Sequence, residues 1–238
     1  MKLHSIESMG ALDGPGLRTV FFLQGCPLRC LYCHNPDTWD PNGPKEIKVD
    51  EIVVKATKYK PYYRRNGGVT FSGGEPLLQA AELRDAMEEI HENGIHTALD
   101  TSGVTVASDD LIREILYFTD LVILDIKHED PDMYKMLTGR SMDSYLRFKR
   151  LLLESGCKIW LRHVVVPAIT DSVEHLQNLM REVESFPQDR VEKFELLPYH
   201  SMGKAKYEEL GIDYVLKDTP DLSMAALQEL KAKAGIHY

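Results

Sequence analysis

The stretch LRTVFFLQGCPLRCLYCHN, residues 17–35, decides the fold that this sequence predicts. Its first seven residues, Leu17–Leu23, form a short run of apolar and β-branched side chains, which is typical of a buried parallel strand. Three cysteines follow this run almost directly. Folds built on parallel strands gather their functional groups at the carboxyl ends of the strands, so the cysteines indicate a functional site.

Similar runs recur along the chain, and amphipathic stretches lie between them. In the stretch Ala80–Glu92, Leu83, Met87 and Ile90 fall on one face of a helix, and Gly94 supplies a left-handed stop. The five further runs that predict strands are Val69–Phe71, Ile95–Leu99, Leu121–Ile126, Lys158–Val166 and Val191–Leu197.

Six strand-then-helix units predict an α/β fold with a parallel sheet and right-handed crossovers. A closed barrel would have eight units and about 250 residues, so we expect an incomplete, TIM-like (β/α)6 barrel that is open at one side. A doubly wound open sheet is the alternative. We expect one domain over residues 1–238, with a core from about 15 to 200 and a short C-terminal extension. Within it, Asp171 and Glu174 predict a capping box that opens a helix through Val183.

Composition excludes several classes of protein. Lys and Arg total 28 and Asp and Glu total 37, which gives a net charge of −9 and argues against nucleic-acid and membrane-surface binding. No run approaches the roughly 18 apolar residues of a transmembrane helix. The first residues, MKLHSIESMGALDG, lack the apolar core of a signal peptide. We therefore expect a cytoplasmic protein.

Three of the four cysteines, Cys26, Cys30 and Cys33, have the spacing C-x3-C-x2-C. Thiolates bind soft metals and iron–sulfur clusters, and three ligands this close share one centre. Three thiolates on a four-iron cluster would leave one iron open to a substrate or cofactor. A zinc site completed by a distant histidine is the alternative. We expect Cys157, far along the chain, to be a small buried hydrophobe.

Polar and charged groups also mark the ends of the other predicted strands, except that Arg162 lies inside the fifth of the six strands. Two adjacent glycines let a backbone approach a ligand closely, carboxylates accept from an ammonium group, and an arginine binds a carboxylate with two hydrogen bonds. These groups are Gly73-Gly74-Glu75, Asp100-Thr101, Asp125-Ile126-Lys127, Arg162 and His200.

The cysteine spacing, with the aromatic Tyr32 before Cys33, resembles the signature of the radical S-adenosylmethionine (SAM) superfamily. Further segments are similar to one family within it, the glycyl-radical-enzyme activating family, and specifically to its pyruvate formate-lyase activators. This similarity runs from about His4 to Tyr214. The segments that carry it are DGPGLR (13–18), CLYCHN (30–35), GIHT (94–97), LDIK (124–127), WLR (160–162) and LPYH (197–200).

The resemblance implies a set of cofactors and ligands. Cys26, Cys30 and Cys33 would hold one 4Fe–4S cluster, and its open iron would bind SAM. The residues that would contact or surround SAM are Tyr32, Cys33, His34, Gly73, Gly74, Glu75, Asp100, Asp125, Ile126, Lys127, Arg162 and His200. A monovalent cation, Na⁺ or K⁺, would be held by Asp100, Thr101, Asp125 and the carbonyl of Ile123.

The resemblance also implies an activity and its partners. Reductive cleavage of SAM would give a 5′-deoxyadenosyl radical that abstracts hydrogen from a backbone glycine of a glycyl radical enzyme, pyruvate formate-lyase. A flavodoxin or ferredoxin would supply the electron, and the chain would act as a monomer. The partner's glycine loop would meet Asp13, Gly14, Pro15, Gly16 and Arg18. His34 to Ser72 contains no cysteine, which implies a single cluster.

Other functions remain possible on the residues alone. A radical SAM enzyme acting on a small molecule would need an added pocket, for which this chain has little extra length. An iron–sulfur electron carrier would use four protein ligands, and a structural zinc protein would contain zinc and no iron. An activator of another glycyl radical enzyme would share the same motifs.

Overall fold

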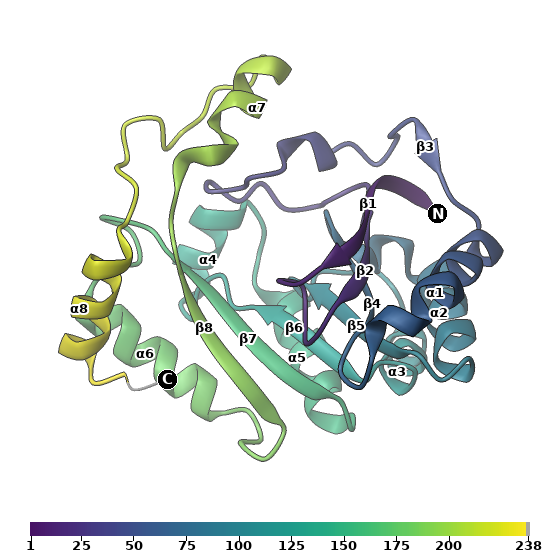
Figure 1. Cartoon of the computed structure of the whole chain (residues 1–238). Coiled ribbons are helices and arrows are strands. Elements are labelled where there is room, and N and C mark those ends of the chain that lie inside the picture. The colour runs from purple at the N-terminus through teal and green to yellow at the C-terminus, as the bar shows by residue number, and fades with distance from the viewer. Residues whose placement is uncertain (237–238) are drawn as a thin grey trace. The chain divides into compact units, whose positions relative to one another are not determined.

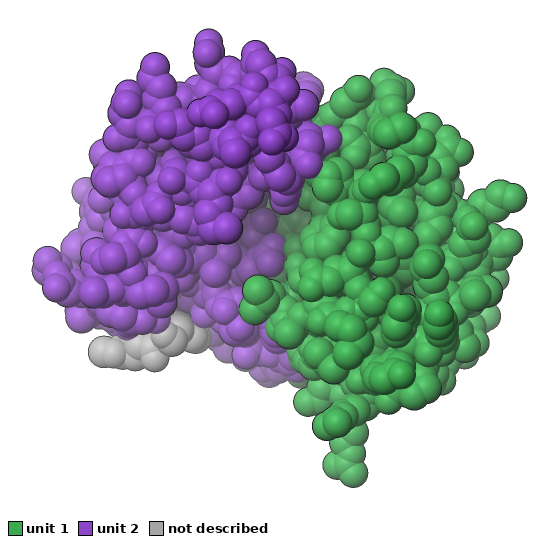
Figure 2. All heavy atoms as spheres, turned by 45° about the horizontal axis from the view of Figure 1, so that its top comes forward, with its two compact units in different colours: residues 1–27, 38–124, 143–159 green, residues 28–37, 125–142, 160–238 purple. Residues whose placement is uncertain are grey.

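The computed structural model describes residues 1–236. The chain forms two compact units, coloured separately in Figure 2. The first unit comprises Met1–Pro27, Thr38–Leu124 and Asp143–Ile159. The second comprises Leu28–Asp37, Asp125–Met142 and the chain from Trp160 onward. The three cysteines of the predicted cluster are therefore shared between the units, Cys26 in the first and Cys30 and Cys33 in the second.

The first unit is built on six strands. Their order in the sheet is β3-β1-β2-β4-β5-β6. The strands β2, β4, β5 and β6 pair in parallel, while β1 pairs antiparallel with both β2 and β3. The bounds are β1 (Lys2–Gly10), β2 (Arg18–Leu23), β3 (Lys45–Glu46), β4 (Gly68–Gly73), β5 (His96–Thr101) and β6 (Leu121–Asp125).

Four helices of the first unit pack beside these strands (Figure 1). The helix α2 (Ala80–Glu92) has the predicted bounds, and Leu83, Met87 and Ile90 are fully buried. Gly94 follows it with a φ of +64°, as the predicted stop requires. The other helices are α1 (Val49–Tyr63), α3 (Asp109–Tyr117) and α5 (Asp143–Glu154), with a 3₁₀ turn η2 (Pro76–Gln79).

The second unit carries most of the last two strands. The sheet order continues from β6 to β7 and β8. The N–H of Tyr199, just after β8, donates to the carbonyl of Val165 at the end of β7, so these two carboxyl ends are aligned. The bounds are β7 (Lys158–Val165), β8 (Val191–Pro198), α4 (Pro131–Thr138), α6 (Val173–Glu184), α7 (Lys204–Leu210) and α8 (Met224–Ala234), with the 3₁₀ turns η1 (Pro36–Thr38) and η3 (Ser201–Gly203).

The predicted fold class is confirmed, since this is an α/β fold whose eight-stranded sheet stays open. All six predicted strands are present, with ends shifted by a residue or two. Two strands were missed, β1 and β3, because β1 is a mostly polar antiparallel strand and β3 has only two residues.

The predicted capping box at Asp171 is wrong. The helix α6 begins at Val173 with Ser172 as its N-cap, whose Oγ accepts from the N–H of His175 at 3.0 Å. Asp171 instead accepts from the N–H of Ala168 at 2.9 Å, in the turn before the helix. Either side chain could cap this helix by type, and the turn at Ala168, whose φ is +62°, decides between them.

Candidate functional site: a cysteine segment and strand-end polar groups

Cys26 follows β2 in the first unit. The N–H of Gly25 donates to the Thr38 carbonyl at 2.8 Å, and the N–H of Cys26 donates to the Trp39 carbonyl at 3.3 Å. The glycine pair after β4 packs against this segment, because a Cβ at Gly74 would overlap the Gly25 carbonyl oxygen and lie 3.3 Å from the Cys26 Cβ. The turn that carries Gly73 and Gly74 and the backbone beside Cys26 therefore form one tightly packed corner of the first unit.

Cys30 and Cys33 lie together in the second unit. The N–H of Cys33 donates to the Cys30 carbonyl at 3.0 Å, which closes a turn around them. The N–H of Arg29 donates to Thr138 and that of Leu31 to Leu137, so the end of α4 holds this turn. Burial raises the pKa of the Cys30 thiol to about 11, against the opposing effect of the Lys127 ammonium. None of the four cysteines, all of which lie within the described residues, forms a disulfide.

His34 is held beside His200 in the second unit. Its Nε2 lies 2.9 Å from the His200 carbonyl oxygen, and the two rings are 4.0 Å apart. Gly203 in η3 permits this approach, since a Cβ there would lie 2.9 Å from the His34 Cα and 3.0 Å from the Cys33 oxygen.

Several buried polar atoms of the second unit have no hydrogen-bond partner among the described residues, and two of these atoms belong to predicted site residues. These two are the Tyr32 hydroxyl and the Nδ1 of His200. Buried polar groups are nearly always paired, so each of these two atoms is suited to a ligand. The resemblance assigns both residues to SAM, and together with the three cysteines they fit a cluster with a bound polar cofactor.

A half-buried charge cluster lies at the end of β6 and on β7. The Asp125 carboxylate accepts from Lys127 Nζ at 2.9 Å through one oxygen and from Arg162 Nε at 3.0 Å through the other. Burial alone would raise the Asp125 pKa, but the two cations outweigh it and hold that pKa well below its usual range. The same carboxylate holds the Lys127 pKa well above its usual range, against the effect of burial. The Lys127 ammonium also lies 5.7 Å from the centre of the Tyr32 ring. The group thus carries two fixed positive charges and one negative charge.

Glu75 is fully buried in the first unit, and its carboxylate has four internal donors. Oε1 accepts from Thr101 Oγ1 at 2.6 Å and from the Leu77 N–H at 3.1 Å, while Oε2 accepts from the Ser102 N–H at 2.9 Å and from the Ser102 hydroxyl. Burial raises the pKa of Glu75 against these bonds. The carboxylate therefore ties the glycine turn to the end of β5.

Asp100 lies at the same end of β5. Its carboxylate accepts from the Ser72 hydroxyl at 2.8 Å, and it is paired in register with Ile123 on β6. Thr101 uses its hydroxyl to donate to Glu75 and to accept from the N–H of Gly103. Among the residues predicted to hold a cation, the first unit thus brings Asp100 and the Ile123 backbone together.

The loop before β2 carries the predicted partner contacts. Gly14 and Gly16 have positive φ values of 129° and 69°, and a Cβ at Gly16 would lie 2.6 Å from the Gly67 nitrogen. Arg18 is fully buried and donates to the carbonyl oxygens of Pro15 and Val69 and to Thr70 Oγ1. Its guanidinium therefore supports the loop from within the unit.

Comparison with known proteins gives the family. The model of the radical SAM superfamily matches residues 20–182. The chain is 51% identical over 218 residues to a pyruvate formate-lyase-activating enzyme of Clostridium pasteurianum, covering 91% of this chain and 90% of that protein. It is 48% identical over 233 residues to the enzyme of that name from Staphylococcus epidermidis, covering 95% and 92%. The chain belongs to the radical SAM superfamily, in the pyruvate formate-lyase-activating enzyme family.

Two solved structures share the fold of this chain. Streptococcus suis SuiB bound to its precursor peptide SuiA matches with a TM-score of 0.67 at 17% identity, over 91% of this chain and 44% of that one. A domain of a pyruvate-formate lyase-activating enzyme from Bacteroides vulgatus matches with a TM-score of 0.55 at 23% identity, over 71% and 93%. These matches do not support the alternative prediction, a doubly wound open sheet. Membership of the superfamily implies a 4Fe–4S cluster and SAM, which sets the zinc interpretation of the three cysteines aside.

Sequence reasoning missed one group of this radical SAM protein. His128, Glu129 and His175 lie together in the second unit. Glu129 and His175 are 46 positions apart, and no spacing motif joins them.

Among the described residues, no helix combines the length and the apolar composition needed to cross a membrane.

Proposed function

We propose that this chain activates a glycyl radical enzyme, pyruvate formate-lyase, by reductive cleavage of SAM. The observation that carries the proposal is 51% identity across nine-tenths of the chain to a relative of that name. A reduced 4Fe–4S cluster with bound SAM supplies the chemistry, giving methionine and a 5′-deoxyadenosyl radical that takes hydrogen from a backbone glycine of the partner. The residues of the chain bind, orient and shelter these groups.

The thiolates of Cys26, Cys30 and Cys33 would hold the cluster, with the fourth iron left to SAM. The burial of Cys30 and the backbone turn that joins it to Cys33 support this assignment. Burial raises the pKa of the Cys30 thiol, and coordination to iron would stabilise its thiolate. Cys33 would in addition lie against SAM.

The second unit would bind the charged and polar parts of SAM. A carboxylate is recognised best by cations fixed in advance, and Lys127 and Arg162 are fixed by Asp125. Tyr32 and His200 each offer a buried polar atom without a protein partner, and His34 is oriented by the His200 carbonyl. Ile126 is fully buried beside them in the chain and would add apolar contact.

The first unit would receive the methionine amino group. Gly73 and Gly74 keep the backbone open to close approach, and Asp100 supplies a carboxylate at the end of the neighbouring strand. We propose that Glu75 belongs to the SAM-binding segment mainly as the residue that orients this turn, because its four donors already occupy both oxygens.

A monovalent cation, Na⁺ or K⁺, would be held by Asp100, Thr101, Asp125 and the Ile123 carbonyl. Support comes from the pairing of Asp100 with Ile123. We expect the affinity for SAM to differ between Na⁺, K⁺ and a cation-free buffer, because the ion would offset carboxylate charge near the cofactor. Equal affinities in all three buffers, measured by calorimetry, would remove this role.

The remaining assignments concern the whole chain. We propose a single radical SAM domain over residues 1–238, with a core of about 15–200 and a short C-terminal extension. It would act as a cytoplasmic monomer and take its electron from a flavodoxin or ferredoxin. The loop of Asp13, Gly14, Pro15 and Gly16 would meet the glycine-bearing loop of the partner, with Arg18 supporting it.

The test is anaerobic incubation of the cluster-loaded chain with pyruvate formate-lyase, reductant and SAM. We expect the doublet of a glycyl radical in the partner by electron paramagnetic resonance, with about one deoxyadenosine formed per radical. A partner whose target glycine is replaced by alanine is the control, and it should give no doublet. Deoxyadenosine formation without any glycyl signal would point to the second candidate class, activation of another glycyl radical enzyme or action on a small molecule.

A further inference from the structure

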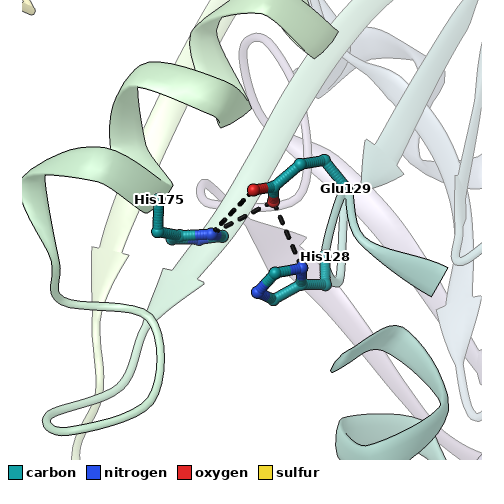
Figure 3. A group of neighbouring side chains, drawn as sticks. All are labelled: His128, Glu129 and His175. Carbon is teal, nitrogen blue, oxygen red and sulfur yellow. Dashed lines mark hydrogen bonds and ion pairs between the residues drawn. The ribbon is translucent and has the colours of Figure 1, made fainter. Parts of the chain in front are cut away.

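Three side chains of the second unit point toward one another (Figure 3). Their residues are far from the three cysteines in the sequence. His128 and Glu129 lie in the segment between β6 and α4, and His175 lies in the first turn of α6. Each offers one ligand atom, and these atoms all lie within 4.8 Å of one another. His128 is 5% exposed and His175 6% exposed, while the Glu129 side chain is 17% exposed and gives the group a side toward solvent.

The distances suit a small metal ion. The Nδ1 of His175 lies 3.1 Å from Glu129 Oε2 and 3.2 Å from Oε1, and the Nδ1 of His128 lies 3.2 Å from Oε2. A tetrahedral zinc ion with ligands at about 2.0–2.1 Å sets neighbouring ligand atoms about 3.3 Å apart. These pairs are therefore already at the spacing that such an ion imposes.

The hydrogen bonding of His128 leaves one oxygen atom of Glu129 without a donor. Its Nδ1 accepts the N–H of Asp130 at 3.0 Å, so it carries a lone pair and cannot donate to Glu129. Glu129 Oε2, buried as an atom, has no hydrogen-bond partner among the described residues. Two lone pairs thus face each other at 3.2 Å, an arrangement that a cation would relieve. An ion would replace the Asp130 N–H as the partner of the His128 lone pair.

A fourth residue, His163 on β7, orients His175. The carbonyl of Ile126 can only accept, so the His163 Nδ1 at 2.7 Å must be the donor to it. When neutral, His163 then accepts through Nε2 from the Nε2–H of His175 at 3.1 Å. His175 is left with its Nδ1 aimed at Glu129, and this is the arrangement by which a second side chain orients a metal-binding histidine.

We propose that His128, Glu129 and His175 bind one divalent transition-metal ion of the zinc class, with His163 as a positioning residue. Two imidazoles and one carboxylate form a common zinc donor set, and water would complete the coordination. The site lies just after Asp125-Ile126-Lys127 in the chain, and His163 donates to Ile126, so the ion would fix α6 and the start of α4 to the segment proposed to bind SAM. This goes beyond the proposed function, which uses only the three cysteines. The rival occupant is a proton that makes His175 an imidazolium paired with Glu129.

The test uses the full chain with its 4Fe–4S cluster loaded, so that the thiolates are occupied. The protein is titrated with Zn²⁺ by calorimetry, and zinc and iron per chain are then measured. We expect about one zinc per chain, bound at least roughly 100-fold more tightly than in Glu129→Gln and His175→Asn. The exposed His91→Asn variant is the matched control and should bind zinc as the parent does.

Zinc X-ray absorption provides a readout independent of activity, with only nitrogen and oxygen neighbours expected. Glu129→Gln keeps the side chain's shape, and its unchanged iron content would show that it folds. Absence of zinc uptake by the parent would assign the group to the imidazolium pair and overturn the proposal. Sulfur neighbours, or equal uptake in all three variants, would overturn it as well. Neither result bears on the glycyl doublet, so the two proposals fail separately.

Discussion

At the scale of single residues, the four cysteines differ in their surroundings more than in their chemistry. Cys30 is buried in a backbone turn near the Lys127 ammonium. Cys157 is also buried, but its Sγ lies 3.2 Å from the Leu116 carbonyl, to which the thiol donates. The sequence distinguished these two by spacing alone, and the structure gives each a separate environment.

This difference predicts opposite results for two matched variants. Cys30→Ala should lose the cluster and all deoxyadenosine formation, because it removes one of only three cluster thiolates. Cys157→Ala should keep both and lose about 1 kcal/mol of stability, as is ordinary for a small buried truncation. Iron and sulfide per chain, and deoxyadenosine by chromatography, are the measurements. Deoxyadenosine formation by Cys30→Ala at the parent rate would contradict the assignment of the three ligands.

The charged residues show which features of the candidate site could be predicted from the sequence and which could not. The place of Asp125 and Lys127 at a strand end was predictable, because parallel strands align their carboxyl ends, and the place of Arg162 within the next strand was predicted as well. Their hydrogen-bond partners were not, since a side chain's partner depends on packing that no local pattern records. Glu75 and Arg18 illustrate this. Glu75 was predicted to contact SAM and Arg18 to contact the partner, but the polar atoms of both side chains form hydrogen bonds within the chain.

At the scale of elements, the apolar pattern was the reliable signal. The helix α2 was predicted to the residue because its apolar face and its glycine stop agree. The strand β1 was missed because it is mostly polar and partly exposed, so it lacks a continuous apolar run. The start of α6 was misplaced by a residue or two because Asp171 and Ser172 are both good caps and only the local turn decides.

The cap of α6 gives a prediction for two adjacent residues. Ser172→Ala should cost about 1 kcal/mol, a fall in Tm of roughly 3 °C, because the His175 N–H loses its acceptor. Asp171→Ala should cost less, since its bond lies in an exposed turn outside the helix. Thermal unfolding followed by circular dichroism in the presence of a chelator measures both. A larger loss of stability in Asp171→Ala than in Ser172→Ala would indicate that Asp171 caps the helix, as the sequence predicted.

A second prediction concerns the ion pairs between α3 and α5. The carboxylate of Asp109 lies 2.6 Å from the guanidinium groups of both Arg150 and Arg147, and their hydrogen bonds lower its pKa. Because the folded state binds the proton more weakly than the unfolded state, this contribution is present above about pH 4 and is lost as the pH falls through the lowered pKa. Asp109→Asn should therefore lower Tm by roughly 2 °C at pH 7 and low salt.

The same difference should shrink as the pH falls below about 4, and it should also shrink in 1 M salt, where exposed charges are screened. Asp213→Asn, an exposed carboxylate in a loop, is the control and should leave Tm unchanged. A deficit in Asp109→Asn that is constant from pH 7 to pH 3 would mean that shape or helix capping is responsible rather than charge.

At the scale of the whole molecule, the cluster chemistry was predicted from a motif whose residues are close in sequence. The proposed metal site was found only from residues that the fold brings together. The cysteine spacing predicted the cluster because the three proposed ligands lie within eight residues. The His128, Glu129 and His175 group escaped notice because its members come from a loop and from a helix 46 positions later. Sites of this second kind can be read only after the chain is folded.

The loop before β2 allows binding of the partner to be separated from the chemistry. Leu12 is 88% exposed next to the glycine turns at Gly14 and Gly16, and exposed apolar side chains beside a rigid turn are typical of binding surfaces. Leu12→Ala should therefore lower the rate of glycyl radical formation roughly tenfold at limiting partner concentration and little at saturation. Partner-independent deoxyadenosine formation should stay at the parent rate, because no proposed cofactor contact involves Leu12. Val106→Ala is the control, since Val106 is equally exposed at 92% and lies outside the loop. If both variants need the same partner concentration for half-maximal activation as the parent does, Leu12 is no part of the docking surface.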